Sequence, residues 1–221
     1  MTANRTLYNY WRSSASYRVR IALNLKGLDY TTQSVHLVRA GGEQHRADYR
    51  KLNPLALVPT LVDGAQVLTQ SLAIMEYLDD AYPETPPLLP TAAPERARAR
   101  AIAQAIACDI HPIGDLRILQ YLAREFAVDD AGRSAWSRHW IEVGFAAIET
   151  MLAAGAGDFC VGAAPSLADC CLVPQVYNAR RHGVALDAYP AIVRIDAACR
   201  RLDAFARAVP EVQPDAPRAP G

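Results

Sequence analysis

Apolar and polar positions follow two different periods in the first part of the chain. Residues 6–11 are mostly apolar and predict a first strand, and helical spacing then predicts a helix over residues 14–26 that ends at Gly27. The apolar positions of this helix are Ala15, Val19, Ala22 and Leu23. Loose alternation over residues 30–37 predicts a second strand, and a loop with two glycines then leads to a short polar helix over residues 43–52.

Residues 58–81 have the pattern of a hairpin followed by a helix. Pro59 cannot donate to a sheet ladder, so we expect it at the start or edge of its strand. Asp63-Gly64 is a strong hairpin signal, and Ser71 is expected to be the N-cap of the next helix. The apolar positions of that helix are Ile74, Tyr77, Leu78 and Ala81. This order of elements predicts a small α/β domain of thioredoxin-like type.

The remainder of the chain is predicted to be helical. Residues 82–94 hold five of the fifteen prolines and indicate a linker. Beyond it we expect an apolar stripe that bends at Pro112, a second apolar stripe, and a helix opened by Ser166 and Asp169 as a capping box, where Asp169 is structural. The first stripe is Ile102, Ile106, Ile110 and Ile113, and the second is Trp136, Trp140, Val143, Ala147 and Met151. A last helix is expected over residues 189–209.

These patterns divide the 221 residues into two domains, a number that this length allows. We expect a thioredoxin-like domain over residues 1–84 and an all-helical domain over residues 95–210, joined by a linker over residues 85–94. Four prolines from residue 210 onward predict a flexible tail over residues 211–221.

The amino-acid composition excludes some classes of binding partner and favours others. Acidic and basic residues number 23 each, so the net charge of zero argues against a nucleic-acid or membrane partner. Only Lys26 and Lys51 are lysines, and the many arginines are suited to bind carboxylates. Five cysteines without metal-like spacing indicate reduced thiols and no metal site. With no secretion signal or apolar span expected, these features predict a cytoplasmic protein.

The start of the first helix is the first place with candidate chemistry. Ser13, Ser14 and Ser16 lie where this helix begins, and a helix N-terminus stabilises an anion such as a phosphate, carboxylate or thiolate. A serine that only caps the helix explains the same pattern, so this stretch gains its functional meaning from the motifs downstream.

Several motifs resemble those of zeta-class glutathione transferases, the family of maleylacetoacetate and maleylpyruvate isomerases. They occur in order over nearly the whole chain: residues 13–23, Asn53-Pro54, Val58-Pro59-Thr60-Leu61, residues 70–74, residues 166–170 and residues 172–176. The resemblance implies the glutathione transferase fold, glutathione as cofactor and a homodimer.

The resemblance also implies roles for individual residues. Ser14 would face the glutathione sulfur, with Ser13 or Ser16 as alternatives. Val58, before a cis Pro59, would offer its backbone to the cysteinyl amide of glutathione. The other implied contacts are Gln70 and Ser71 for the γ-glutamyl end, Gln44 for the glycyl end, and His111 for the cofactor or substrate. Ala15 stands where the family motif has cysteine, which disfavours thiol–disulfide chemistry.

Three arginines resemble the substrate-binding pattern of bacterial maleylpyruvate isomerases. They are Arg12, Arg117 and Arg180, with Arg181 as a competitor of Arg180 and surface salt bridges as the alternative role. On the predicted helix, Arg180 shares a face with apolar residues, so it requires a partner.

The implied reaction is a glutathione-dependent cis–trans isomerisation of maleylpyruvate, or of maleylacetoacetate, in the breakdown of aromatic compounds. The glutathione thiolate would add to the cis double bond, the product would rotate about the resulting single bond, and elimination would leave the trans fumaryl isomer. Two alternatives stay open: a general glutathione S-transferase of zeta type, and a glutathione-binding protein without catalysis.

Overall fold

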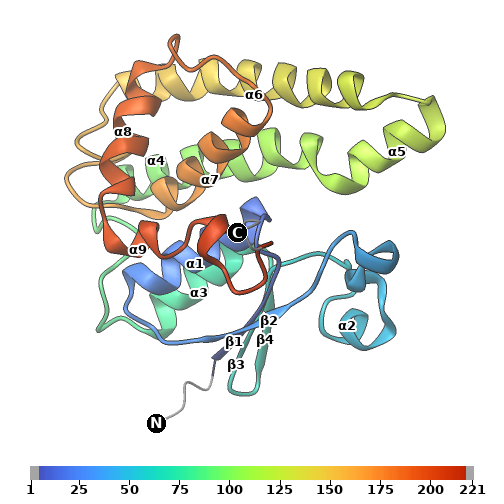
Figure 1. Cartoon of the computed structure of the whole chain (residues 1–221). Coiled ribbons are helices and arrows are strands. Elements are labelled where there is room, and N and C mark those ends of the chain that lie inside the picture. The colour runs from blue at the N-terminus through green and yellow to red at the C-terminus, as the bar shows by residue number, and fades with distance from the viewer. Residues whose placement is uncertain (1–4, 218–221) are drawn as a thin grey trace. The chain divides into compact units, whose positions relative to one another are not determined.

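The computed structural model describes residues 5–217, which form two compact units. One unit ends at Leu88 and is completed by the segment that begins at Leu202, and the other is Leu89–Arg201. In the first unit the β-strands have the order β2-β1-β3-β4, with β1 parallel to β2 and antiparallel to β3 (Figure 1). The strands are β1 (Arg5–Asn9), β2 (Thr31–Ser34), β3 (Thr60–Asp63) and β4 (Gln66–Thr69).

The helices α1 (Ser14–Leu25) and α3 (Ser71–Ala81) contact each other and complete the thioredoxin-like topology predicted from the sequence. Gly27 follows α1 with a φ of +63°, a conformation that glycine adopts without steric cost, so the predicted helix end is confirmed. Leu7 and Leu61, which are register partners on β1 and β3, are fully buried. The core of this unit also contains buried apolar side chains from both helices, namely Val19, Leu23, Ile74, Met75 and Leu78.

The region between β2 and β3 differs from the single polar helix that was predicted. It contains two short turns of 3-10 helix, η1 (Arg39–Gly41) and η2 (Glu43–His45), and the helix α2 (Ala47–Leu52). The predicted helix is interrupted because Arg46 adopts an extended conformation, with φ −65° and ψ 145°. Tyr49 from α2 packs in a cluster with Tyr10, Val35 and Val58, which connects α2 to the ends of β1 and β2.

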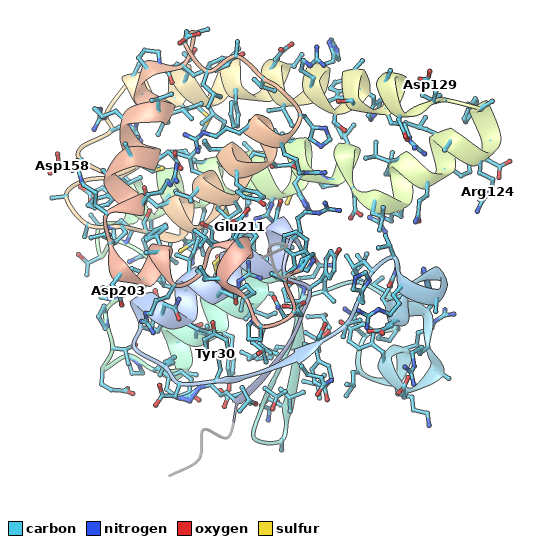
Figure 2. The ribbon with its side chains drawn as sticks, in the orientation of Figure 1. Tyr30, Arg124, Asp129, Asp158, Asp203 and Glu211 are labelled. Atoms are coloured by element: carbon cyan, nitrogen blue, oxygen red, sulfur yellow. The ribbon has the colours of Figure 1, made fainter. Side chains whose placement is uncertain are left out.

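The second unit is all-helical, as predicted. Its helical elements are α4 (Ala93–Gln104), the π-helical turn η3 (Ala105–Ile110), the 3-10 turn η4 (His111–Gly114), α5 (Leu116–Phe126), α6 (Asp130–Ala153), α7 (Leu167–Arg181) and α8 (Pro190–Arg200). The predicted bend at Pro112 falls in η4. Asp129, labelled in Figure 2, caps α6 by accepting a hydrogen bond from Gly132 N. Among residues 5–217, no helix has the length and apolar character needed to cross a membrane.

The buried face of α6 is not the one predicted. Its buried residues are Ser137, Ile141, Phe145, Ile148 and Leu152, whereas Val143 from the predicted stripe is 51% exposed. The helix has apolar residues on two faces, and the spacing of apolar residues alone does not show which face is buried. The capping box on α7 is confirmed: both oxygens of the fully buried Asp169 accept hydrogen bonds, from Cys160 N (2.9 Å), Ser166 N (2.8 Å) and Ser166 Oγ (2.9 Å).

The end of the chain also differs from the prediction. In place of one helix over residues 189–209, α8 stops at Arg200 and is followed by the short helix α9 (Asp203–Ala206) and the 3-10 turn η5 (Pro210–Val212). From Leu202 onward the chain groups with the first unit, so the boundary expected at residue 210 lies at Arg201. Within the expected flexible tail, Gln213 is buried and Asp215 accepts hydrogen bonds from Trp11 N and Ser34 Oγ, so the segment is anchored as far as Asp215. Residues 218–221 lie outside the described part.

We expect Asp169→Ala to lower the free energy of unfolding by about 3 kcal/mol, because it leaves two buried backbone N–H groups without their acceptors. Urea unfolding monitored by circular dichroism measures this change. The control is Asp187→Ala, which removes an exposed aspartate of the same unit and should change stability by less than about 0.5 kcal/mol. Equal stabilities for the two variants would contradict the assigned role of Asp169.

Candidate functional site

The turn from β1 into α1 gives its three serines different roles. Ser13 is the N-cap of α1, since it has an extended backbone and its Oγ accepts a hydrogen bond from Ser16 N at 3.2 Å. Ser16 is fully buried. Ser14 is the first residue of the helix, and its hydroxyl has no hydrogen-bond partner among residues 5–217. Ser14 is therefore the serine whose hydroxyl is available to a ligand at the helix N-terminus.

The peptide bond between Val58 and Pro59 is cis and directly precedes β3, which confirms both expectations for Pro59. The preceding loop is held at the carbonyl oxygen of Leu57, which accepts hydrogen bonds from Tyr49 Oη (2.5 Å) and Asn53 Nδ2 (2.8 Å). Within the described part of the chain, neither the N–H nor the C=O of Val58 has a hydrogen-bond partner. A peptide-like ligand can pair with both groups in the manner of an added strand.

Gln70 and Ser71 lie at the N-terminus of α3, but Ser71 is not the cap that was predicted. Gln70 holds the N-cap position with a φ of +69°, which is uncommon for a residue other than glycine and is often found at functional sites. In the part of the chain that the structure describes, the Gln70 side chain makes no capping hydrogen bond. The buried Ser71 Oγ instead accepts a hydrogen bond from Arg18 Nη1 at 3.1 Å. This helix start therefore combines free backbone N–H groups with a guanidinium one residue away, a favourable setting for a carboxylate.

Gln44 lies in η2 and is almost fully buried. Its Nε2 donates a hydrogen bond to Leu37 O at 3.2 Å, while Oε1 has no partner among residues 5–217. The buried amide thus retains one unused acceptor.

The arginines and the histidine expected at the site belong to both units. Arg12, in the first unit, is exposed, with its guanidinium 5.3 Å from the centre of the Trp11 ring. In the second unit, His111 begins η4 and is half-buried, and Arg117 is exposed in the first turn of α5. Arg180, in the last turn of α7, forms an ion pair with Asp196, Nη2 to Oδ2 at 2.6 Å.

Asp196 is the partner that the position of Arg180 required. Its side chain is only 2% exposed, whereas that of Arg180 is 42% exposed, so the buried carboxylate depends on the arginine more than the reverse. Arg200 lies 3.9 Å from the same Asp196 oxygen. Arg181 donates instead to Asn178 Oδ1 at 2.8 Å.

Sequence reasoning missed two buried arginines of α1. Arg18 contacts Ser71, and Arg20 donates three hydrogen bonds within the first unit. The available signal for Arg18 was its position four residues after Ser14, because positions i and i+4 share a helix face.

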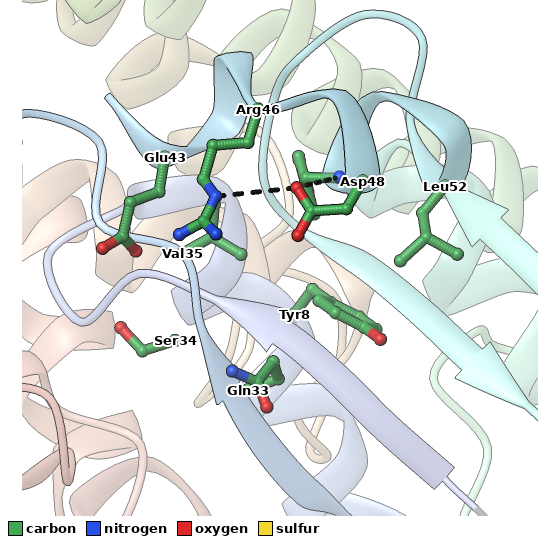
Figure 3. A pocket seen from close by; sticks show the side chains of 9 residues that line it. Tyr8, Gln33, Ser34, Val35, Glu43, Arg46, Asp48 and Leu52 are labelled. Carbon is green, nitrogen blue, oxygen red and sulfur yellow. Dashed lines mark hydrogen bonds and ion pairs between the residues drawn. The ribbon is translucent and has the colours of Figure 1, made fainter. Parts of the chain in front are cut away.

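A cleft of about 380 Å³ lies in the first unit, and none of the predicted site residues line it. Figure 3 shows it between β2 and the region of α2, with Tyr8 and Leu52 on its apolar side and an ion pair between Arg46 Nε and Asp48 Oδ1 at 3.6 Å. Tyr49 also lines the cleft, and burial raises the pKa of its phenol, which stays neutral and donates a hydrogen bond to the Leu57 carbonyl. Among the described residues, no group of three or more His, Cys, Asp or Glu side chains is placed to hold a metal ion.

Comparison with known proteins adds to this geometry. Residues 12–81 match the family model described as the glutathione S-transferase N-terminal domain. The chain is 55% identical to a probable maleylacetoacetate isomerase from Vibrio cholerae, over 95% of this chain and 97% of that protein.

Two solved structures are similar over nearly the whole chain. One is the holo structure of a maleylpyruvate isomerase, a bacterial zeta-class glutathione S-transferase, with 51% identity, a TM-score of 0.93, and coverage of 96% of this chain and all of that one. The other is a maleylacetoacetate isomerase from Methylobacterium extorquens AM1 with bound malonate and glutathione, with 41% identity, a TM-score of 0.92 and the same coverage.

The different roles of the serines predict different effects on stability. Ser13→Ala removes the N-cap of α1 and should lower the free energy of unfolding by about 1 kcal/mol. Ser14→Ala removes a hydroxyl that has no partner among the described residues and should change this free energy by less than about 0.5 kcal/mol. Urea unfolding of the two variants without added ligand tests this difference, and a larger loss for Ser14→Ala would contradict the assignment.

Proposed function

The chain belongs to the zeta class of the glutathione transferases, and on this basis we propose that it is a glutathione-dependent cis–trans isomerase of maleylpyruvate or maleylacetoacetate. The observation that carries the proposal is the set of unused groups in the first unit. Ser14 lies at one helix start, Val58 offers a free backbone edge, and Gln70 begins a second helix. These groups fit a tripeptide with a thiol, a central peptide unit and a terminal carboxylate.

Each part of glutathione has a proposed partner. Ser14 donates a hydrogen bond to the sulfur, Val58 pairs with the cysteinyl amide, and Gln44 contacts the glycyl end. Gln70 and Ser71 bind the γ-glutamyl carboxylate. Because Arg18 donates to Ser71 Oγ, the oxygen is used as an acceptor and the hydroxyl hydrogen can point to the ligand.

The residues of this chain would promote the reaction by lowering the pKa of a thiol and by binding an acidic substrate. Bound glutathione supplies the thiolate that adds reversibly to the cis double bond. The Ser14 hydroxyl and the N-terminus of α1 stabilise negative charge on the sulfur. Arg12 lies two residues from Ser14, so we assign it the carbonyl whose oxygen gains charge during the reaction.

Arg117 and Arg180 are proposed to bind substrate carboxylates, and His111 to donate or accept a hydrogen bond at the cofactor or substrate. For Arg180 this is a second role, added to its ion pair with Asp196. We further propose a homodimer in the cytoplasm. All five cysteines are free and four are buried, which suits a reducing compartment.

The first test measures the loss of maleylpyruvate absorbance with glutathione in trace amounts. We expect many turnovers per glutathione, because the thiol is released in every cycle. Ser14→Ala should lower kcat about a hundredfold, while the matched Ser13→Ala variant should stay within about threefold of the wild type. Stoichiometric consumption of glutathione would instead indicate a general transferase, and glutathione binding without turnover a binding protein.

The second test separates the two roles of Arg180. Arg180→Ala should raise KM for the dicarboxylate about tenfold or more, with little change in the Kd for glutathione measured by calorimetry. Arg200→Ala is the matched control, because it removes the other arginine beside Asp196 and should leave KM unchanged. If both variants raise KM equally, the arginine serves only Asp196.

A further inference from the structure

Both polar groups of the Trp11 backbone are held by hydrogen bonds from or to side chains. Trp11 N donates to Asp215 Oδ2 at 2.9 Å, across 204 positions of sequence. Trp11 O accepts from Arg20 Nη2 at 3.0 Å. Trp11 directly precedes Arg12 and lies three residues before Ser14. The position of the Trp11 peptide therefore determines the position of the turn and of the first residues of α1.

Arg20 is fully buried in α1 and connects the turn to two other parts of the first unit. Its Nη1 donates to Asn9 Oδ1, at the end of β1, at 2.6 Å. Its Nε donates at 3.0 Å to Ala208 O, which belongs to the C-terminal segment, the part of the chain that begins at Leu202. Buried guanidinium hydrogen bonds have a narrow choice of geometry, since the donors form a rigid fork. The C-terminal segment therefore holds Trp11 twice, directly through Asp215 and indirectly through Ala208 and Arg20.

The C-terminal segment is itself anchored to the rest of the first unit by burial and hydrogen bonds. Phe205 is fully buried, and Asn24 Nδ2 of α1 donates to Ala204 O at 2.9 Å. Gln213 is buried and its Nε2 donates to Arg207 O (3.0 Å) and Val209 O (2.9 Å), which folds the segment back on itself. Figure 1 shows α9 and the described end of the chain beside α1.

Asp215 also joins the turn to the second strand. The Oδ2 atom that accepts from Trp11 N accepts from Ser34 Oγ at 3.2 Å as well, so one carboxylate oxygen connects the end of β2 with the residue after β1. Hydrogen bonds to a charged acceptor are stronger than those between neutral groups. Asp215 is the last residue of the segment with such a contact to the turn in the part of the chain that the structure describes.

We propose that Asp215 is a positioning residue, which, together with Arg20, holds the Trp11 peptide and so sets the place of Arg12 and Ser14. The inference rests on the proposed function for the roles of these two residues and extends it to the C-terminal segment. Asp215 acts through the backbone and does not contact the ligand.

The test compares Asp215→Ala with Asp215→Asn. Alanine removes the acceptor for Trp11 N, whereas asparagine keeps one acceptor oxygen while it removes the charge and replaces the other oxygen with an NH2 group. We expect Asp215→Ala to lower kcat about tenfold and to raise the midpoint of the thiolate titration of bound glutathione, followed by its ultraviolet absorbance. Asp215→Asn should stay close to the wild type in both measurements, because a neutral amide oxygen still accepts the hydrogen bond.

A truncation pair gives the same comparison without a substitution. A chain that ends at Gln213 lacks Asp215 but keeps the buried part of the segment, and it should behave like Asp215→Ala. A chain that ends at Pro217 should behave like the wild type. Asp29→Ala, which removes an exposed aspartate of the same unit, is the control for a loss of charge.

The outcomes separate the two proposals. If the wild type isomerises and Asp215→Ala matches Asp29→Ala in kcat and in titration midpoint, the positioning role is wrong. It is also wrong if Asp215→Ala and Asp215→Asn are equally impaired, since the effect is then one of charge, or if kcat and melting temperature fall without a shift in the titration midpoint. If the wild type binds glutathione without isomerising, yet the midpoint responds only to Asp215→Ala, the proposed function fails and the positioning role stands.

Discussion

The hydrogen bonding of one buried guanidinium, that of Arg20, holds the first unit together. A charged group without contact to water is tolerated only if its donors find acceptors, and those of Arg20 reach the end of β1, the turn after it and the C-terminal segment. The end of β1 with its adjoining turn, and a segment 188 positions after Arg20, therefore have to meet at this side chain. The start of α1, where Ser14 lies, is fixed as a result of this requirement.

The parts of the fold that were predictable from sequence are those that depend on neighbouring residues. The hairpin at Asp63-Gly64, the end of α1 at Gly27 and the capping box of Asp169 all follow local rules and are confirmed. The errors occur where a distant partner decides. On α6, Val143 and Phe145 are equally apolar, and only the neighbouring helices determine that Phe145 is buried and Val143 exposed.

The candidate site shows the same division. The resemblance to a known family pointed to Val58, Pro59, Gln70 and Ser71 as candidate residues, and the cis bond at Pro59 is confirmed. Sequence spacing could not reveal that Ser71 accepts a hydrogen bond from Arg18, because that contact spans 53 positions and depends on how α1 meets α3. It also left the choice among three serines open, whereas the backbone geometry gives Ser13 the capping role and leaves the Ser14 hydroxyl without a partner in the described part of the chain.

The discontinuity of the first unit has a consequence for biosynthesis. Its sheet and its first helices leave the ribosome early, but Ala208 and Asp215 are made only after the entire helical unit. During translation, Arg20 is synthesised long before Ala208, one of its hydrogen-bond acceptors. The nascent first unit is therefore less stable than the finished one. Its last folding step follows the synthesis of nearly all of the chain. A protein cut at the boundary after Leu88 would retain this immature state permanently, because the turn before α1 would lack its contacts with Ala208 and Asp215.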